Sequence, residues 1–204
     1  MDIHDDSSER ELHRFLFLDV DSVLTTIEHA DYLVAHGEES YDEDGNLFDP
    51  EAVENLAYIV EKVPDVKIVI SSSLRFKGWE WMNRLWEKRL MPGKIYSFTP
   101  VLKQIYFSDI INQSEIISTR KDFNRGVEVE EWLRQNVKMG DLYFYAILGD
   151  SIDYLFYQAK FVASCNVVNG LTKSVAEKIV DILYTEFGRD SMINFDKMPH
   201  SIFR

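Results

Sequence analysis

Residues 14–20 read RFLFLDV, and this apolar run that ends in acid decides the fold. Short, uninterrupted apolar runs are typical of strands that are buried on both faces, as in parallel sheets. Two later runs have the same character, KIVI at 67–70 and DLYFYAIL at 141–148. We therefore predict three buried strands, each followed directly by polar residues.

Amphipathic segments lie between and after these strands. Apolar residues at helical spacing predict helices, and shorter apolar runs predict two more strands. The predicted helices are 50–63, 78–90, 126–137 and 172–187, and the added strands are 95–98 and 161–164. Strands that alternate with helices predict an α/β fold with a central parallel sheet and helices on both faces.

The domain organisation is expected to be simple. We predict one domain over residues 1–188 and a C-terminal tail over 189–204. The segment 27–48 is expected to form a flap or long loop, because it is polar and acidic and contains Gly37 and Gly45. Its DEDGN run at 42–46 lacks the Gly and Glu positions of a calcium loop, so we interpret it as a solvated acidic surface.

Composition excludes several classes of protein. The 204 residues are 46% hydrophobic and 13% aromatic, which excludes a disordered or collagen-like chain. The single cysteine, Cys165, excludes an internal disulfide and a cysteine-based zinc site and is typical of a reducing compartment. The acidic N-terminus and short apolar runs predict neither a signal peptide nor a membrane span. We therefore expect a cytoplasmic protein without a membrane partner.

Charge is distributed unevenly along the chain. The net charge of −13 opposes broad binding to nucleic acid, whose phosphates need Lys and Arg contacts. Residues 75–94 nevertheless hold six basic side chains, whereas 27–55 holds ten acidic side chains and no basic ones. The sequence therefore permits a local contact with a phosphorylated nucleic-acid end.

Polar residues at the predicted strand ends indicate a site. In parallel α/β sheets, ligands bind beyond the carboxyl ends of the strands. Four acids and one hydroxyl are expected there: Asp19, Asp21, Ser71, Asp150 and Asp153. Carboxylates gathered in this way repel one another unless a cation neutralises them, and Mg²⁺ prefers oxygen ligands together with a substrate phosphate. We therefore predict that these four acids bind Mg²⁺, with no other stable cofactor.

The Asp-x-Asp spacing suggests phosphoryl transfer. One carboxylate can attack phosphorus as a nucleophile while the other holds a proton for the leaving oxygen. The Ser71 hydroxyl could bind a phosphate oxygen, and Ser72 and Arg75 are candidate substrate-binding residues. Ser72 could instead cap the helix that follows.

A basic side chain should also neutralise the transferring phosphoryl group. Arg125 and Lys121 are the main candidates and Arg120 is another, since all three precede the 141–148 strand. A purely structural alternative is a helix-surface pair between Arg125 and Glu128.

Aromatic side chains in 78–90 offer a further alternative. Trp79 and Trp86 share the apolar face of this predicted helix and are expected in the core. Trp81 lies off that face and could stack on a base.

The motifs FLFLDVDSVLTT, KIVISSS and YAILGDSID, in this order, resemble the first, second and fourth motifs of the haloacid dehalogenase (HAD) superfamily of phosphohydrolases. FDPEAVENLAYIV, IVISSSLR, RGVEVEEWL and GLT are similar to the small HAD domains associated with RNA-repair proteins. TRKDFNRGVEVEEWL is also similar to the 3′-phosphatase domains of polynucleotide kinase-phosphatases. Together these resemblances cover residues 14–187.

The resemblance implies a Rossmann-like HAD fold with a minimal cap or none. It implies that Asp19 is a nucleophile that forms an aspartyl-phosphate, and that Asp21 is a general acid/base whose carbonyl binds the metal. It further implies that Ser71 binds phosphate, that Asp150 binds the metal, and that Asp153 supports Asp150.

Three positions depart from the usual HAD pattern. Arg125 or Lys121 stands for the usual third-motif Lys, Gly149 replaces the first of two adjacent acids, and Ser22 replaces a common Gly. We predict a Mg²⁺-dependent phosphatase, acting on nucleic-acid 3′-phosphate ends or on nucleotides. The alternative is a weakly active or inactive module that binds Mg²⁺ and phosphate or a protein partner.

Overall fold

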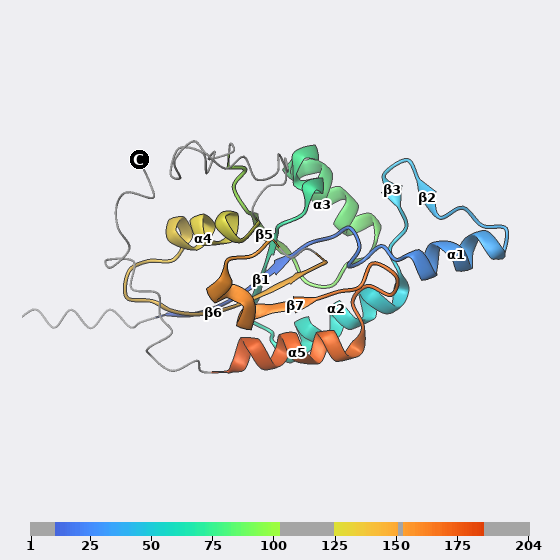
Figure 1. The fold of residues 1–204 in the computed structure, drawn as a ribbon. Helices are drawn as coiled ribbons and strands as arrows, with labels where there is room; N and C mark the ends of the chain where they lie inside the picture. The colour runs from blue at the N-terminus through green and yellow to red at the C-terminus, as the bar shows by residue number, and fades with distance from the viewer. Residues whose placement is uncertain (1–10, 103–124, 151–152, 186–204) are drawn as a thin grey trace, which may run out of the picture.

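The computed structural model describes residues 11–102, 125–150 and 153–185. Its centre is a parallel five-stranded sheet in the order β5-β4-β1-β6-β7 (Figure 1). The strands are β1 (Leu12–Leu18), β4 (Val66–Ile70), β5 (Ile95–Phe98), β6 (Leu142–Gly149) and β7 (Val162–Ser164). The predicted α/β class and parallel sheet are confirmed, and no large cap domain is present in the described ranges.

Helices cover both faces of this sheet (Figure 1). One face carries α2 (Pro50–Lys62) and α5 (Lys173–Tyr184), and the other carries α3 (Trp79–Lys88) and α4 (Arg125–Asn136). There are also two short 3₁₀ helices. The first, η1 (Ser73–Lys77), follows β4, and the second, η3 (Phe156–Phe161), precedes β7. None of the helices in the described ranges has the length and apolarity needed to cross a bilayer.

β1 is the central strand and is almost completely buried after its first residues. Side chains alternate along a strand, so Phe15 and Phe17 point to the same face. Both rings make edge-on contacts with Trp132 of α4, at centroid distances of 4.9 and 5.3 Å. The position of α4 over β1 is therefore set by one buried tryptophan.

The segment 27–48 is more ordered than expected. The prediction of a loop is wrong for α1 (Ile27–Ala35), a helix whose N-cap Thr26 accepts a hydrogen bond from the His29 N–H. β2 (Tyr41–Asp42) and β3 (Gly45–Asn46) then form a two-stranded antiparallel hairpin. The acidic run that we interpreted as a solvated surface is the turn of this hairpin.

Trp79 also departs from its predicted place. It was expected in the core with Trp86, but 47% of Trp79 is exposed, while Trp86 is buried. Trp79 lies at the first residue of α3 and packs on Phe98, with ring centroids 5.2 Å apart. The predicted tail and most of the 99–124 segment lie outside the described residues.

Candidate active site

The carboxyl ends of three adjacent strands bring the first site residues together. Leu18 is paired with Ile70 on one side and with Leu148 on the other. The next residue along each strand is therefore Asp19 at the centre, flanked by Ser71 and Gly149. Backbone hydrogen bonds hold this register, because Asp19 N donates to Leu148 O and Ser71 N donates to Leu18 O, at 2.9 and 2.8 Å.

Asp19 is a buried carboxylate, with only 3% of the residue exposed. Its Oδ1 accepts a hydrogen bond from Val20 N at 2.8 Å, and its carboxyl group also bonds with the Ser72 hydroxyl. Burial raises the pKa of Asp19 to about 6, although Arg125, Ser72 and Val20 act to lower it. The carboxyl group is therefore mostly ionised at pH 7.

Arg125 reaches Asp19 from the first residue of α4. Its Nη2 lies 3.1 Å from Asp19 Oδ2, and the arginine side chain is 20% exposed. The alternative pairing of Arg125 with Glu128 is not the one formed, because Glu128 bonds with Arg75 instead. Lys121 lies outside the described residues, as does Arg120. Among the described candidates, Arg125 is therefore the cation beside the central acid.

Two buried polar atoms next to Asp19 lack a hydrogen-bond partner among the described residues. They are Ser71 Oγ and Arg125 Nη1. Buried donors in native proteins are nearly always paired, so an unpaired one calls for an explanation. A hydroxyl from the neighbouring strand end and a guanidinium N–H, both without a partner, fit an oxyanion bound beside Asp19.

Asp21 lies at the mouth of a cavity beside this site. It is only partly buried, and the Ser73 hydroxyl donates to its Oδ2 at 3.5 Å. Burial raises the pKa of Asp21, while Ser73, Arg125 and Lys77 lower it. Ser22 follows in the left-handed region with φ of 61°, which explains why glycine would suit this position. Its N–H donates to Thr25 Oγ1 at 3.1 Å.

The end of β6 explains the missing first acid of the fourth motif. A Cβ atom on Gly149 would lie 2.6 Å from the Tyr154 hydroxyl and 3.5 Å from Asp19 Cβ, so a larger residue would fit there only if the Tyr154 side chain moved. The exposed Asp150 that follows raises the pKa of both Asp19 and Asp21. The Asp153 carbonyl accepts a hydrogen bond from Gly126 N at 2.9 Å, which ties this loop to α4.

Arg75 requires a correction. It was predicted to bind substrate, but it is buried, with 6% exposure. Its Nη2 contacts Glu128 Oε2 at 2.6 Å, and its Nη1 donates to the carbonyls of Ser71 and Ser72 at 3.3 and 2.8 Å. The Nη groups are thus taken up by the protein, and Arg75 holds the Ser71-Ser72 backbone against α4.

Ser72 has the capping role considered for it, and its contact with substrate stays a prediction. It is buried, its hydroxyl accepts from Leu74 N at 3.2 Å as the N-cap of η1, and it contacts Asp19. The predicted cap is therefore present, and the same hydroxyl orients the central carboxylate.

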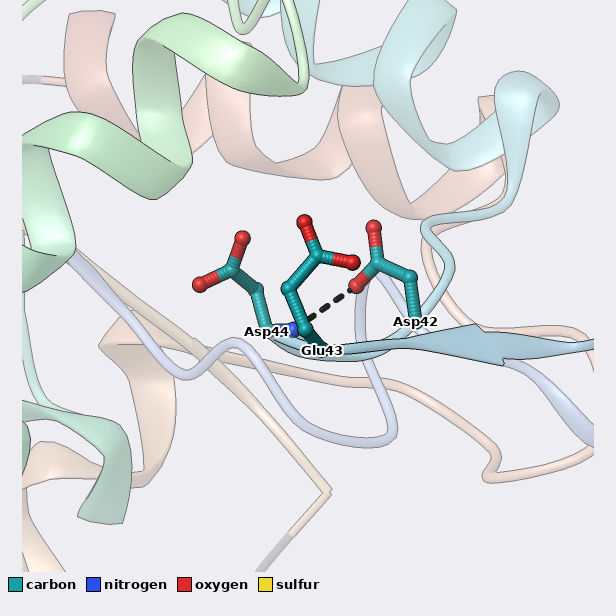
Figure 2. Close-up of side chains that lie close together, drawn as sticks. All are labelled: Asp42, Glu43 and Asp44. Atoms are coloured by element: carbon teal, nitrogen blue, oxygen red, sulfur yellow. Dashed lines mark hydrogen bonds between the residues drawn. The ribbon is translucent and has the colours of Figure 1, made fainter.

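The closest cluster of acids lies elsewhere, at the hairpin turn (Figure 2). Within the described ranges, Asp42, Glu43 and Asp44 are the only three acidic, His or Cys residues whose ligand atoms all lie within 4.8 Å of one another. Lys88 forms ion pairs with all three, and Arg89 binds Asp42 through two nitrogens at 2.8 and 2.9 Å. These cations lower the pKa of each acid, so the cluster is neutralised from within the chain.

Sequence analysis did not identify two contributors to the site. Glu128 was considered only as a partner of Arg125, and Lys77, which acts on Asp21, was considered only as one of the six basic residues in 75–94. The Glu128 contact with Arg75 spans 53 positions, so no local spacing predicts it. For Lys77, its place seven residues after Ile70, the last residue of β4, was the available signal.

Comparison with known families agrees with the fold and the order of the motifs. The family described as HAD domain in Swiss Army Knife RNA repair proteins matches residues 15–176. The chain belongs to this family. The match covers the three strand ends, α4 and most of the helices, and it confirms the HAD resemblance. No curated protein and no solved structure matches the chain.

Proposed function

We propose that this HAD domain is a phosphatase in which Asp19 is the nucleophile. The observation that carries the proposal is a pair of unpartnered buried groups: Ser71 Oγ, at the strand position beside Asp19, and Arg125 Nη1, on the guanidinium that contacts the Asp19 carboxylate. They supply a hydrogen-bond donor and a charged donor for phosphate oxygens, which are the groups that stabilise a transferring phosphoryl group.

The chemistry follows from the environments of the two aspartates. Asp19 Oδ attacks phosphorus, the P–O bond to the leaving group breaks, and an aspartyl-phosphate forms. Asp21, whose pKa is raised by burial, donates its proton to the leaving oxygen. Asp21 then takes a proton from the water that attacks the aspartyl-phosphate, which frees Asp19 and inorganic phosphate.

The donor set fits a magnesium ion. Asp19, Asp21 and Asp150 offer oxygen atoms, and each of the first two has its pKa raised by Asp150. Mg²⁺ prefers such oxygen ligands and would neutralise the negative charge that builds up on the phosphoryl group. We therefore propose these three residues as its ligands, with Asp153 supporting them.

The substrate that we propose is a short phosphorylated end, either the 3′-phosphate of a nucleic acid or a nucleotide. Four of the six basic residues in 75–94 already pair with acids of the chain, and they are Arg75, Arg84, Lys88 and Arg89. Of this stretch, Lys77 and Lys94 alone have no ion pair with an acid of the described residues, so contact between this stretch and a substrate should be confined to the phosphorylated end.

Asp19→Asn tests this proposal. We expect turnover of 3′-phosphorylated oligonucleotides and nucleoside monophosphates with Mg²⁺, and a loss of at least about 10³-fold in kcat for the variant. Asp31→Asn, on the exposed face of α1, is the matched control. If wild type releases no phosphate from any substrate but binds Mg²⁺, the protein is the inactive binding module instead.

A further inference from the structure

A cavity of about 180 Å³ opens beside Asp21, and neither Arg125 nor any other residue of α4 is among the residues that line it. Its walls come from the end of β1, from the β2–β3 hairpin and from η1 and α3. The lining includes Asp21, Thr25, Asn46, Phe48, Leu74 and Lys77. The proposed catalytic acid, Asp21, and the segment between 27 and 48 therefore line the same cavity.

The position of the cavity beside Asp21 indicates that it can hold the leaving group of a substrate. Asp21 is the proposed proton donor to the leaving oxygen, so the leaving group must lie on the side of Asp21. The cavity is the hollow on that side, because Asp21 is itself one of its lining residues. Whatever carries the phosphate therefore extends into it.

The size and the lining indicate a single ring. A cavity of about 150 Å³ holds one benzene molecule, whereas whole drug-sized ligands need about 300 Å³ or more. The lining has apolar side chains, Phe48 and Leu74, and polar ones, Asn46 and Lys77. A sugar ring, with hydroxyls and an apolar C–H surface, matches both kinds of wall.

The hairpin wall is held in place by a hairpin clamp, which we define as Asp42, Glu43 and Asp44 with Lys88 and Arg89. Figure 2 shows the three acidic side chains side by side on the turn, where Asp44 N donates to Asp42 Oδ1 at 2.9 Å. The clamp joins the hairpin to the end of α3, more than 40 residues away in sequence. The wall is therefore tied to the core domain and does not depend on a separate cap.

We propose that this cavity binds the sugar ring that carries the phosphate, and that Asn46 and Lys77 determine this specificity. The inference rests on the proposed phosphatase function. A base attached to the sugar would lie outside the cavity, because the volume admits one ring only. The ring could belong to a nucleotide or to a free sugar phosphate, and these sources are separated below.

The test compares three substrates: uridine 3′-monophosphate, glucose 6-phosphate and acetyl phosphate, which has no ring. Asn46→Trp fills the cavity from an exposed position of β3, and Asn169→Trp, in an exposed turn, is the matched control. We expect Asn46→Trp to lower the ratio of kcat/KM for a ring substrate to that for acetyl phosphate by about 10-fold or more. The control should leave the ratio unchanged.

Smaller changes should give a graded response. Lys77→Ala removes a polar contact and Arg89→Ala removes one of the two cations of the clamp, and each should lower the ratio by about 3- to 10-fold. The control for Lys77 is Lys94→Ala. Lys94 directly precedes β5, at the amino end of that strand, whereas the site lies at the carboxyl ends of the strands. A larger effect for uridine 3′-monophosphate identifies a nucleotide ring, and a larger effect for glucose 6-phosphate identifies a free sugar phosphate.

The failures can be told apart. If Asn46→Trp changes turnover of all three substrates equally, or of none, the ring site is overturned and the phosphatase function stands. If wild type hydrolyses none of them, the phosphatase function is overturned. The ring site is then judged by calorimetric binding of uridine 3′-monophosphate, which must be weakened in Asn46→Trp for the site to stand.

Discussion

The Asp19 carboxyl group is both buried and close to an arginine, and these two effects act on its pKa in opposite directions. Burial is the larger one, so the pKa rises from 3.8 to about 6. The folded chain then binds this proton more tightly than the unfolded chain, and the stability of the fold falls as the pH rises from about 4 to 6. Ionisation of Asp19 therefore lowers the stability of the fold, but it provides the charged carboxylate that the proposed reaction needs.

This cost predicts that Asp19→Asn stabilises the metal-free protein. The variant should exceed wild type in free energy of unfolding by about 1–3 kcal/mol at pH 7.5. The advantage should shrink by about 1 kcal/mol at pH 5, because wild-type Asp19 is then largely protonated in the folded state. Urea unfolding at both pH values in the presence of a chelator measures this, and a difference that does not change with pH would contradict it.

Arg125 has two donor groups with different surroundings. Its Nη2 contacts Asp19, and its Nη1 has no hydrogen-bond partner among the described residues. Arg125→Ala should lower kcat/KM by about 10²- to 10³-fold, the effect of removing one donor to a developing oxyanion. Arg125→Lys keeps the charge but not the two donors, so it should recover only part of this loss. Arg134→Ala, on the same helix and paired with Glu131 at the surface, is the control. Equal activity of Arg125→Ala and the control would exclude Arg125 from the reaction.

Among the elements, the strands of the central sheet could be predicted because each is a short apolar run. Their parallel direction could be predicted from the alternation of strands and helices. The β2–β3 hairpin could not, since its turn is held by Lys88 and Arg89 from a distant helix. Arg75 was misplaced for the same reason: its partner Glu128 lies on α4, and nothing near Arg75 in sequence marks it as buried. Contacts between distant elements decided the roles that sequence left open.

Helix α4 illustrates how such contacts position a site residue. Gly126 N donates to Asp153 O, and the Gly126 carbonyl accepts from Gln158 Nε2 at 2.9 Å. A Cβ at Gly126 would lie 2.5 Å from Gln158 Oε1 and 2.6 Å from Leu155 N, so there is no room for a side chain. The first turn of α4, with Arg125, is therefore docked on the 153–158 loop through a glycine.

Gly126→Ala should accordingly disturb both stability and activity. We expect a loss of about 1–3 kcal/mol in free energy of unfolding, since the backbone or Gln158 must move to admit the methyl group. Displacement of the neighbouring Arg125 should lower kcat more than it changes KM. Gln135→Ala, on the exposed surface of α4, should change neither. Wild-type stability and kcat in Gly126→Ala would show that this docking has no role.

On the scale of the whole molecule, charge is balanced locally in spite of the net charge of −13. The acidic hairpin takes up the cations of α3, and the buried Arg75–Glu128 pair joins the sheet edge to α4. Both arrangements surround Asp19 and Asp21 with contacts between separate elements. The carboxyl edge of the sheet is therefore assembled by ion pairs as well as by apolar packing.

The Arg75–Glu128 pair gives the clearest test of this assembly. Both side chains are almost fully buried, at 4% and 1% exposure. Removal of one partner leaves a buried charge without its counter-ion, so Arg75→Met or Glu128→Leu should each cost about 3–5 kcal/mol of unfolding free energy. The double variant removes both charges and should recover much of that loss, because apolar residues of similar volume often replace a buried pair without cost.

Activity separates the positioning role from a purely structural one. Arg75 also holds the carbonyls of Ser71 and Ser72, so the double variant should fold and yet show a reduced kcat, with the Ser71 hydroxyl less well placed. The surface pair Arg134–Glu131, replaced in the same way, should change stability by less than about 1 kcal/mol and leave kcat unaltered. A double variant that folds stably and retains wild-type kcat would show that Arg75 supports the fold alone.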